Sequence, residues 1–191
     1  MRVYDRQVFL NVPFDARYKK LLRALVFSVH ECGLVARCAQ EKDDGGQVRV
    51  DKLLAIIRQC RFGIHDLSRT TLDGKNRLPR FNMPLELGLF LGARNFGGHD
   101  QRSKVCLILD SERYRYQIFC SDIAGQDIRA HANEVSRALA VVRDWLQTHL
   151  PARARPRSNH GTSNSNNSCP TCAGSTASSR LSFHSSTIGT S

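Results

Sequence analysis

Short apolar runs alternate with segments of helical periodicity through residues 1–150, and this alternation strongly constrains the fold. Apolar runs at 7–12, 34–38, 62–66 and 105–109 are predicted to be strands, because each ends at or near a turn-forming or polar residue. A chain in which helices separate such strands builds a parallel sheet with helices on both faces. The sequence therefore predicts an α/β domain of three layers.

Four helices are predicted from apolar residues that recur every three or four positions. Their apolar positions are, in chain order, Tyr18, Leu22, Leu25 and Val29; Val50, Leu53, Leu54 and Ile57; Leu85, Leu89 and Ala93 after an opening Pro84; and Ile128, Ala132, Val135, Leu139, Val142 and Leu146. Residues 113–127 fit a short helix and an edge strand.

The composition changes abruptly after Leu150, where a basic, proline-bracketed run gives way to Ser, Thr, Asn and Gly. Such a segment cannot bury enough apolar surface to offset its ordering entropy, so residues 151–191 are predicted to be a disordered tail. Cys169 and Cys172 in this tail have the spacing of zinc or redox motifs. Their disordered surroundings argue against either site, and no metal is expected.

Charge and cysteine content exclude several classes of protein. No apolar run approaches the ~20 residues of a transmembrane helix, and the apolar stretch after the charged N-terminus is too short for a signal peptide. Seven cysteines without regular spacing favour free thiols, so the expected location is the cytoplasm, with no membrane partner. The net charge of +11 comes from scattered residues without a DNA-binding motif, which favours a phosphate-bearing ligand over nucleic acid.

Ligands of parallel sheets bind at the carboxyl ends of the strands, so polar residues there are the candidate site. The first strand ends in Asn11, followed by Pro13, Phe14 and Asp15. Backbone N–H groups at the start of the next helix favour anions, and Asp15 either contacts a ligand or caps that helix. The capping interpretation is the stronger of the two.

His65, Asp66 and Ser68 mark the end of the third strand. The Asp66 carboxylate is placed to reach a sugar hydroxyl, although Asp66 or Ser68 alternatively caps a turn. Because strand side chains alternate, His65 and Asp66 should point to opposite faces, which makes a joint catalytic pair unlikely and favours packing for His65.

Asn82 and Glu86 lie at the start of the third predicted helix. An acidic residue there is alternatively explained by the helix macrodipole. However, Glu86 is flanked by Leu85 and Leu87, and partial burial would raise its pKa and favour acid–base or nucleophilic chemistry.

Residues 8–15, 57–68 and 80–88 together resemble the nucleoside 2-deoxyribosyltransferase-like and TIR-like superfamily, and uncharacterised bacterial members in particular. Residues 121–127 and a final helix with a Trp-Leu pair extend the resemblance over about residues 7–148. It implies a flavodoxin-like sheet of about five strands. It also implies chemistry at the N-glycosidic bond of a nucleoside, a nucleotide or NAD.

The resemblance implies a role for several of these residues. Glu86 matches the glutamate that attacks or stabilises the sugar C1′ carbon, and Asp66 roughly matches an acidic contact to the sugar or base. Pro13 and Phe14 match the pocket lining. Asn11, Asp15, Ser68 and Asn82 are expected to contact substrate as well.

Three functions are therefore expected in order of preference. The first is an N-glycosidase or glycosyltransferase with Glu86 as catalytic carboxylate, acting in bacterial defence or signalling. The second is a nucleotide-binding sensor without catalysis, and the third is a TIR-type interaction domain that forms homo-oligomers. No cofactor is expected, and NAD or another nucleotide enters only as substrate.

Overall fold

The computed structural model describes residues 2–41, 46, 48–70 and 81–150. The chain divides into two units, Met1–Arg157 and Ser158–Ser191, and every described residue belongs to the first. The predicted disordered tail and its two cysteines lie outside the described residues.

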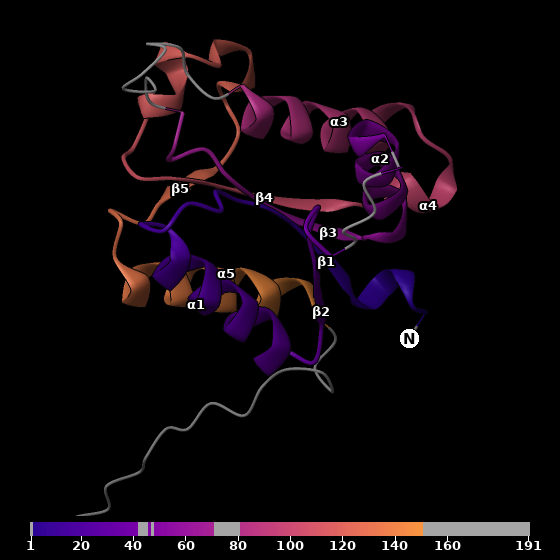
Figure 1. Ribbon diagram of the computed structural model, residues 1–191, viewed down its shortest axis with the longest axis horizontal. Helices are drawn as coiled ribbons and strands as arrows, with labels where there is room; N and C mark the ends of the chain where they lie inside the picture. Colours follow the sequence, from indigo (N-terminus) through magenta and orange to yellow (C-terminus); the bar gives the residue numbers. More distant parts are fainter. Residues whose placement is uncertain (1, 42–45, 47, 71–80, 151–191) are drawn as a thin grey trace, which may run out of the picture. The chain divides into compact units, whose positions relative to one another are not determined.

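Five parallel strands form one sheet in the order β2-β1-β3-β4-β5. The strands are β1 (Gln7–Asn11), β2 (Val35–Arg37), β3 (Phe62–Asp66), β4 (Val105–Asp110) and β5 (Ile128–Ala130). Helices flank this sheet, so the predicted three-layer α/β fold is confirmed (Figure 1).

Two helices cover each face of the sheet (Figure 1). Helices α1 (Lys19–Glu31) and α5 (Val135–His149) lie on one face, and α2 (Arg49–Gln59) and α3 (Asn82–Phe96) lie on the other. Short helices are η1 (Tyr4–Arg6), α4 (His99–Arg102), η2 (Arg115–Ile118) and η3 (Ser121–Ile123). Among the helices that the structure describes, none is long and apolar enough to cross a membrane.

The alternating side chains of β1 and β3 supply both layers of the core. Val8 and Ile64 pack with residues of α1 and α5, including Leu25. Phe9 faces the opposite layer, where it packs with residues of α2 and α3 such as Phe90. The alternation explains why every position of both strands is buried, since helices cover both faces of a parallel sheet.

Gly63 marks a close approach between β3 and α3. A Cβ atom at this position would lie 2.7 Å from the Phe90 ring and 2.7 Å from Nε2 of His65. No real Cβ atom tolerates such contacts, so glycine is required for these two rings to pack over the strand.

The predicted face of the third helix is confirmed in part, because Leu89 and Ala93 pack against the core but Leu85 does not. Leu85 is 57% exposed, and the buried positions are Glu86, Leu87 and Phe90. Periodicity misleads here because α3 is apolar nearly all round. Pro84 is the third residue of α3 rather than the first, a position where its missing N–H is still harmless.

The last helix begins later than its apolar pattern predicts. Ile128 belongs to β5, and α5 starts at Val135. Between them Ala132 and Asn133 adopt left-handed conformations, with φ of 52° and 59°, which a continuous helix excludes. In the second helix, the predicted apolar face includes Val50, which is 48% exposed.

The five described cysteines are all free, as predicted. Cys32 and Cys60 are buried, whereas Cys38, Cys106 and Cys120 are partly exposed. Burial raises the pKa of the Cys60 thiol to about 12, which keeps this group protonated and unreactive.

Candidate functional site

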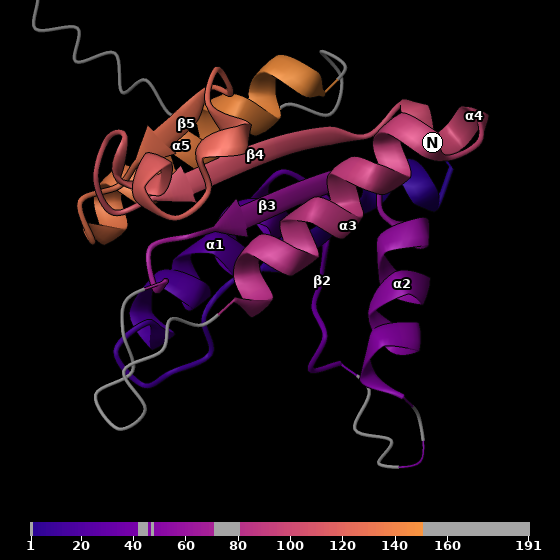
Figure 2. The same cartoon turned by 90° about the horizontal axis from the view of Figure 1, so that it is seen from above.

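The strand order places a topological switch point between β1 and β3. From β1 the chain moves outward to β2, and it then returns to the other side of β1 as β3. Helices therefore diverge at the carboxyl ends of these two strands, and a crevice between them is where ligands of such sheets bind. Figure 2 shows the start of α3 beside this end of β3.

Asn11 ties the end of β1 to the first turn of α3. Its Nδ2 atom donates to the carbonyl oxygen of Met83 at 2.8 Å and lies 3.0 Å from Nδ1 of His65. Its Oδ1 atom is buried without a hydrogen-bond partner in the part of the chain that the structure describes. Asn11 therefore offers a spare acceptor at the expected site.

Glu86 lies one helical turn after Met83, in the second turn of α3 rather than the first. Its side chain is 8% exposed, and no described residue forms a hydrogen bond to it. Burial raises the pKa of this carboxyl to about 7, an effect that Arg49 at the start of α2 opposes only weakly. Near pH 7 the group therefore exists in both protonation states.

Asp66 differs from Glu86 because hydrogen-bond donors surround its carboxylate. Its fully buried carboxylate accepts the Ser68 N–H at 2.8 Å, the Tyr18 hydroxyl and the His131 ring. The His131 Nδ1 atom accepts the N–H of Asn133 at 3.0 Å, which leaves Nε2 to donate to Asp66 at 3.0 Å.

These donors hold the pKa of Asp66 below its usual value, although burial acts in the other direction. The Asp66 carboxylate is enclosed in this structure and its donors all belong to the protein, so its expected contact with a ligand stays a prediction. Asp66 joins the end of β3 to residues that precede α1 and α5. The alternative that it caps a turn, through Ser68, is confirmed.

Ser68 and Pro13 are buried, whereas Phe14 is partly buried and packs against the core beneath α1 and α5. The Ser68 hydroxyl has no hydrogen-bond partner among the residues described. Ser68 and Asn11 thus each present an unpaired polar atom where β3 and β1 end.

Asp15 accepts backbone N–H groups from Arg17 at 3.0 Å and Tyr18 at 3.1 Å. It also pairs with Arg69 at 3.0 Å, which links the segments that follow β1 and β3. The capping interpretation is confirmed, although the capped feature is the turn before α1 rather than the helix itself. Asn82 is exposed at the first position of α3.

His65 is a packing residue, as predicted. Its ring meets Phe90 edge-on with centroids 4.9 Å apart, and it faces Phe9 at 5.8 Å. Complete burial lowers the pKa of His65 to about 3, so the ring is neutral at physiological pH. His65 and Asp66 lie on opposite faces of the sheet, and they do not form a catalytic pair.

Sequence reasoning missed a second buried carboxylate, Asp110, at the end of β4. Its carboxylate accepts hydrogen bonds from Nε of Arg115 at 2.8 Å and from the N–H of Ser111 at 2.6 Å. Burial raises the pKa of Asp110. Arg115 also donates to the Leu67 carbonyl at 2.6 Å. The available signal was an acidic residue directly after the apolar run 105–109, which matches Asp66 after 62–65.

The arrangement contains one buried carboxyl whose pKa is about 7 and, at the same end of the sheet, three polar atoms without a described partner: Asn11 Oδ1, Ser68 Oγ and Asp110 Oδ2. Such a carboxyl can accept a proton or stabilise a developing positive charge. Within the described ranges, no cluster of three or more histidines, cysteines and carboxylates is arranged to hold a metal ion.

Comparison with known proteins leaves the resemblance without independent support. A scan against protein-family models found no match, and a search of curated proteins found none either.

Proposed function

We propose that this chain cleaves or transfers at the N-glycosidic bond of a nucleoside, a nucleotide or NAD, with Glu86 as the catalytic carboxylate. The observation that carries the proposal is the state of Glu86: buried, without a hydrogen-bond donor among the described residues, and with a pKa of about 7. Structural carboxylates are normally paired, as Asp66 is, so an unpaired one at a switch point favours a role in binding or catalysis.

The chemistry follows from the charge that develops in the reaction. As the bond between C1′ and the base nitrogen breaks, the sugar acquires positive, oxocarbenium-like charge and the base leaves with the bonding electrons. The ionised Glu86 carboxylate stabilises this charge or bonds to C1′, and water or an acceptor then replaces the base. Oδ1 of Asn11 and the Ser68 hydroxyl are available for the sugar hydroxyls.

The resemblance to deoxyribosyltransferase-like and TIR-like proteins supports the same assignment, since Glu86 occupies the position of their glutamate. Nucleotide substrates are abundant in the cytoplasm, where we propose that the protein acts. Asp66 enters this proposal as a positioning residue, because it fixes the segment that carries Ser68.

A product assay tests the proposal. The protein is incubated with NAD and with a panel of nucleosides and nucleotides, and released base is measured by chromatography. Wild type and Glu31→Gln should release base, because Glu31 is an exposed residue at the end of α1. Glu86→Gln should release none while retaining its fold by circular dichroism.

The pH dependence adds an independent readout. Because the reaction requires ionised Glu86, kcat/KM should rise as the pH passes through about 7. Turnover by Glu86→Gln would refute the role of Glu86. Saturable binding of a nucleotide without any product would instead favour the sensor function.

A further inference from the structure

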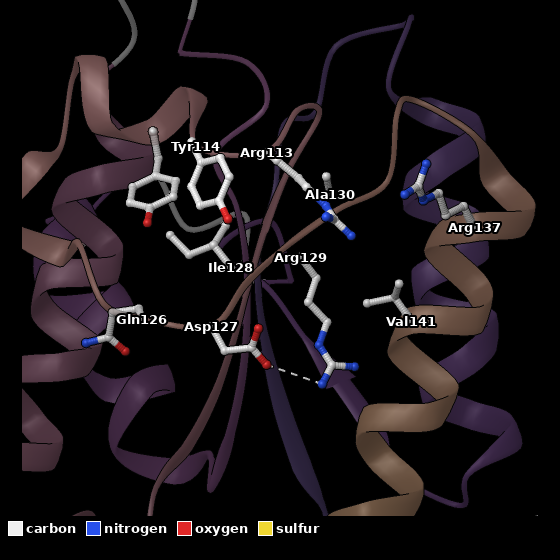
Figure 3. Close-up of a pocket in the computed structure, with 10 residues that line it drawn as sticks. Arg113, Tyr114, Gln126, Asp127, Ile128, Arg129, Ala130, Arg137 and Val141 are labelled. Carbon is white, nitrogen blue, oxygen red and sulfur yellow. Dashed lines mark hydrogen bonds and ion pairs between the residues drawn. The ribbon is translucent and has the colours of Figure 1, made fainter.

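A second candidate site lies at the outer edge of the sheet, away from the switch point. A pocket of about 450 Å³ opens beside β5, and its walls come from the segment after β4, from β5 itself and from α5. Its lining residues include Arg113, Tyr114, Asp127, Arg129 and Arg137 (Figure 3). This volume is in the range that small-molecule ligands occupy.

Positive charge in this pocket exceeds negative charge. Arg129 pairs with Asp127 at 3.3 Å, and Asp127 is the one carboxylate among the lining residues. Arg113 and Arg137 have no carboxylate partner in the part of the chain that the structure describes. Figure 3 shows Arg137 extending from α5 and Arg113 from the segment after β4. Two guanidinium groups at one pocket therefore lack counter-charges.

Arg137 lies near the start of a helix. It is the third residue of α5, whose N-cap residue is Glu134, and the first turn of the helix itself contains no acidic residue. A helix N-terminus carries partial positive charge, which disfavours a cation and favours an anion. An anionic ligand would relieve the repulsion among Arg113, Arg137 and the helix end.

Unfavourable backbone conformations gather at the same place. The non-glycine residues with positive φ in the described ranges are Tyr114, Ala132 and Asn133, at 63°, 52° and 59°. Tyr114 lines the pocket, and the other two connect β5 to α5. Conformations of this kind persist where the surrounding structure requires them, often at ligand sites.

We propose that this pocket binds a small phosphorylated ligand of the nucleoside di- or triphosphate class, separately from the Glu86 site. Arginine guanidinium groups bind phosphate oxygens in pairs, which suits Arg113 and Arg137. Tyr114 is 67% exposed at the pocket rim and offers an aromatic face for the base. The proposal does not depend on the chemistry proposed for Glu86, and a separate experiment tests it.

Isothermal titration calorimetry with ADP, inorganic pyrophosphate and adenosine tests it. We expect Arg113→Gln and Arg137→Gln each to weaken ADP and pyrophosphate binding about tenfold or more, as loss of a charge-assisted hydrogen bond does. Arg143→Gln is the matched control, because Arg143 is exposed on the same helix but does not line the pocket. Glu31→Gln, at an exposed position at the end of α1, should bind ADP as wild type does.

Tyr114→Asn tests the contribution of the nucleoside to binding separately from that of the phosphates. Asparagine is chosen because it tolerates the left-handed backbone conformation of Tyr114. The substitution should weaken ADP binding and leave pyrophosphate binding unchanged. Equal affinities of the wild type for ADP and pyrophosphate would overturn the nucleoside assignment. Absent binding, or identical binding by the arginine variants and Arg143→Gln, would overturn the site.

Discussion

Asp66 and Glu86 are both buried carboxyls, on opposite faces of the sheet, and their states differ completely. Asp66 accepts hydrogen bonds from Ser68, Tyr18 and His131, and its pKa lies below the usual value. Glu86 has no such donors among the described residues, and its pKa is about 7. Burial alone therefore does not determine whether a carboxyl is charged near pH 7. The hydrogen-bond donors around the carboxyl also determine its pKa.

The difference also separates two uses of a buried acid. A carboxylate surrounded by donors stabilises the fold. A carboxyl without donors costs stability when ionised, and such a cost is typical of groups retained for function. Three substitutions would break or sharpen this comparison.

The largest effect is expected for Asp66→Asn. It removes a fully buried charge and leaves the Tyr18 hydroxyl, the His131 ring and the Ser68 N–H with a poorer acceptor. Hydrogen bonds to a charged group contribute about 1.5–3 kcal/mol each, so weakening all three should lower the free energy of unfolding in urea near neutral pH by about 3–5 kcal/mol.

Because the folded-state pKa of Asp66 is depressed, its stabilisation is present above the unfolded value of 3.8 and is lost as the pH falls through the folded value. The difference between wild type and Asp66→Asn should accordingly shrink in acid. The exposed Asp122→Asn serves as control. A loss no larger than that of the control would contradict the buried network.

Glu86→Gln should act in the opposite direction and stabilise the protein at alkaline pH. The folded pKa of about 7 exceeds the unfolded value of 4.5, so the stability of the wild type is greatest below 4.5 and falls as the pH rises to 7. At about 1.4 kcal/mol per pKa unit, the fall approaches about 3 kcal/mol.

Glutamine has no such titration, so the variant should be the more stable protein above about pH 7, and the gap should close in acid. Urea midpoints measured from about pH 4 to about pH 8 should show this gap open as the pH rises. A difference between the two proteins that stays constant with pH would mean that folding does not change the pKa of Glu86.

The smallest effect is expected for Asp15→Asn. Asparagine still accepts the N–H groups of Arg17 and Tyr18, so the variant loses only the partly exposed ion pair with Arg69. Such pairs contribute about 0.2–1 kcal/mol. Denaturation in about 0.1 M and about 1 M NaCl should show a difference that is screened at the higher concentration, and salt independence would argue against an ionic contribution.

The sequence predicts the layers of the fold well, because a strand run such as 105–109 is apolar, short and bounded by polar residues. It predicts helix boundaries less well. The periodic positions Ile128 and Ala132 continue the pattern of α5 by coincidence, and only the left-handed backbone at Ala132 reveals the break. In α3 the surrounding structure, rather than periodicity, selects the buried face.

The sequence predicts those residues of the site that follow from local pattern, but not the contacts between distant segments. Asn11, Ser68 and Glu86 follow predicted strands or begin a predicted helix, so local pattern is enough to find them. The partners of Asp66 come from residues 48 and 65 positions away in the chain. No local pattern connects Tyr18 or His131 with Asp66, and tertiary folding alone brings them together.

Gly63 bears on how distant relatives of this chain should be sought. Any side chain there collides with the ring of Phe90, whereas Gly88 and Gly92 on α3 have open space around the Cβ position. A mutational library selected only for folding should therefore keep glycine at 63 and accept alanine at 88 and 92. A glycine two residues before a His-Asp pair at a strand end is thus a better marker of common ancestry than Asp66 or Glu86. Packing alone requires this glycine, so it should persist in relatives that have lost activity.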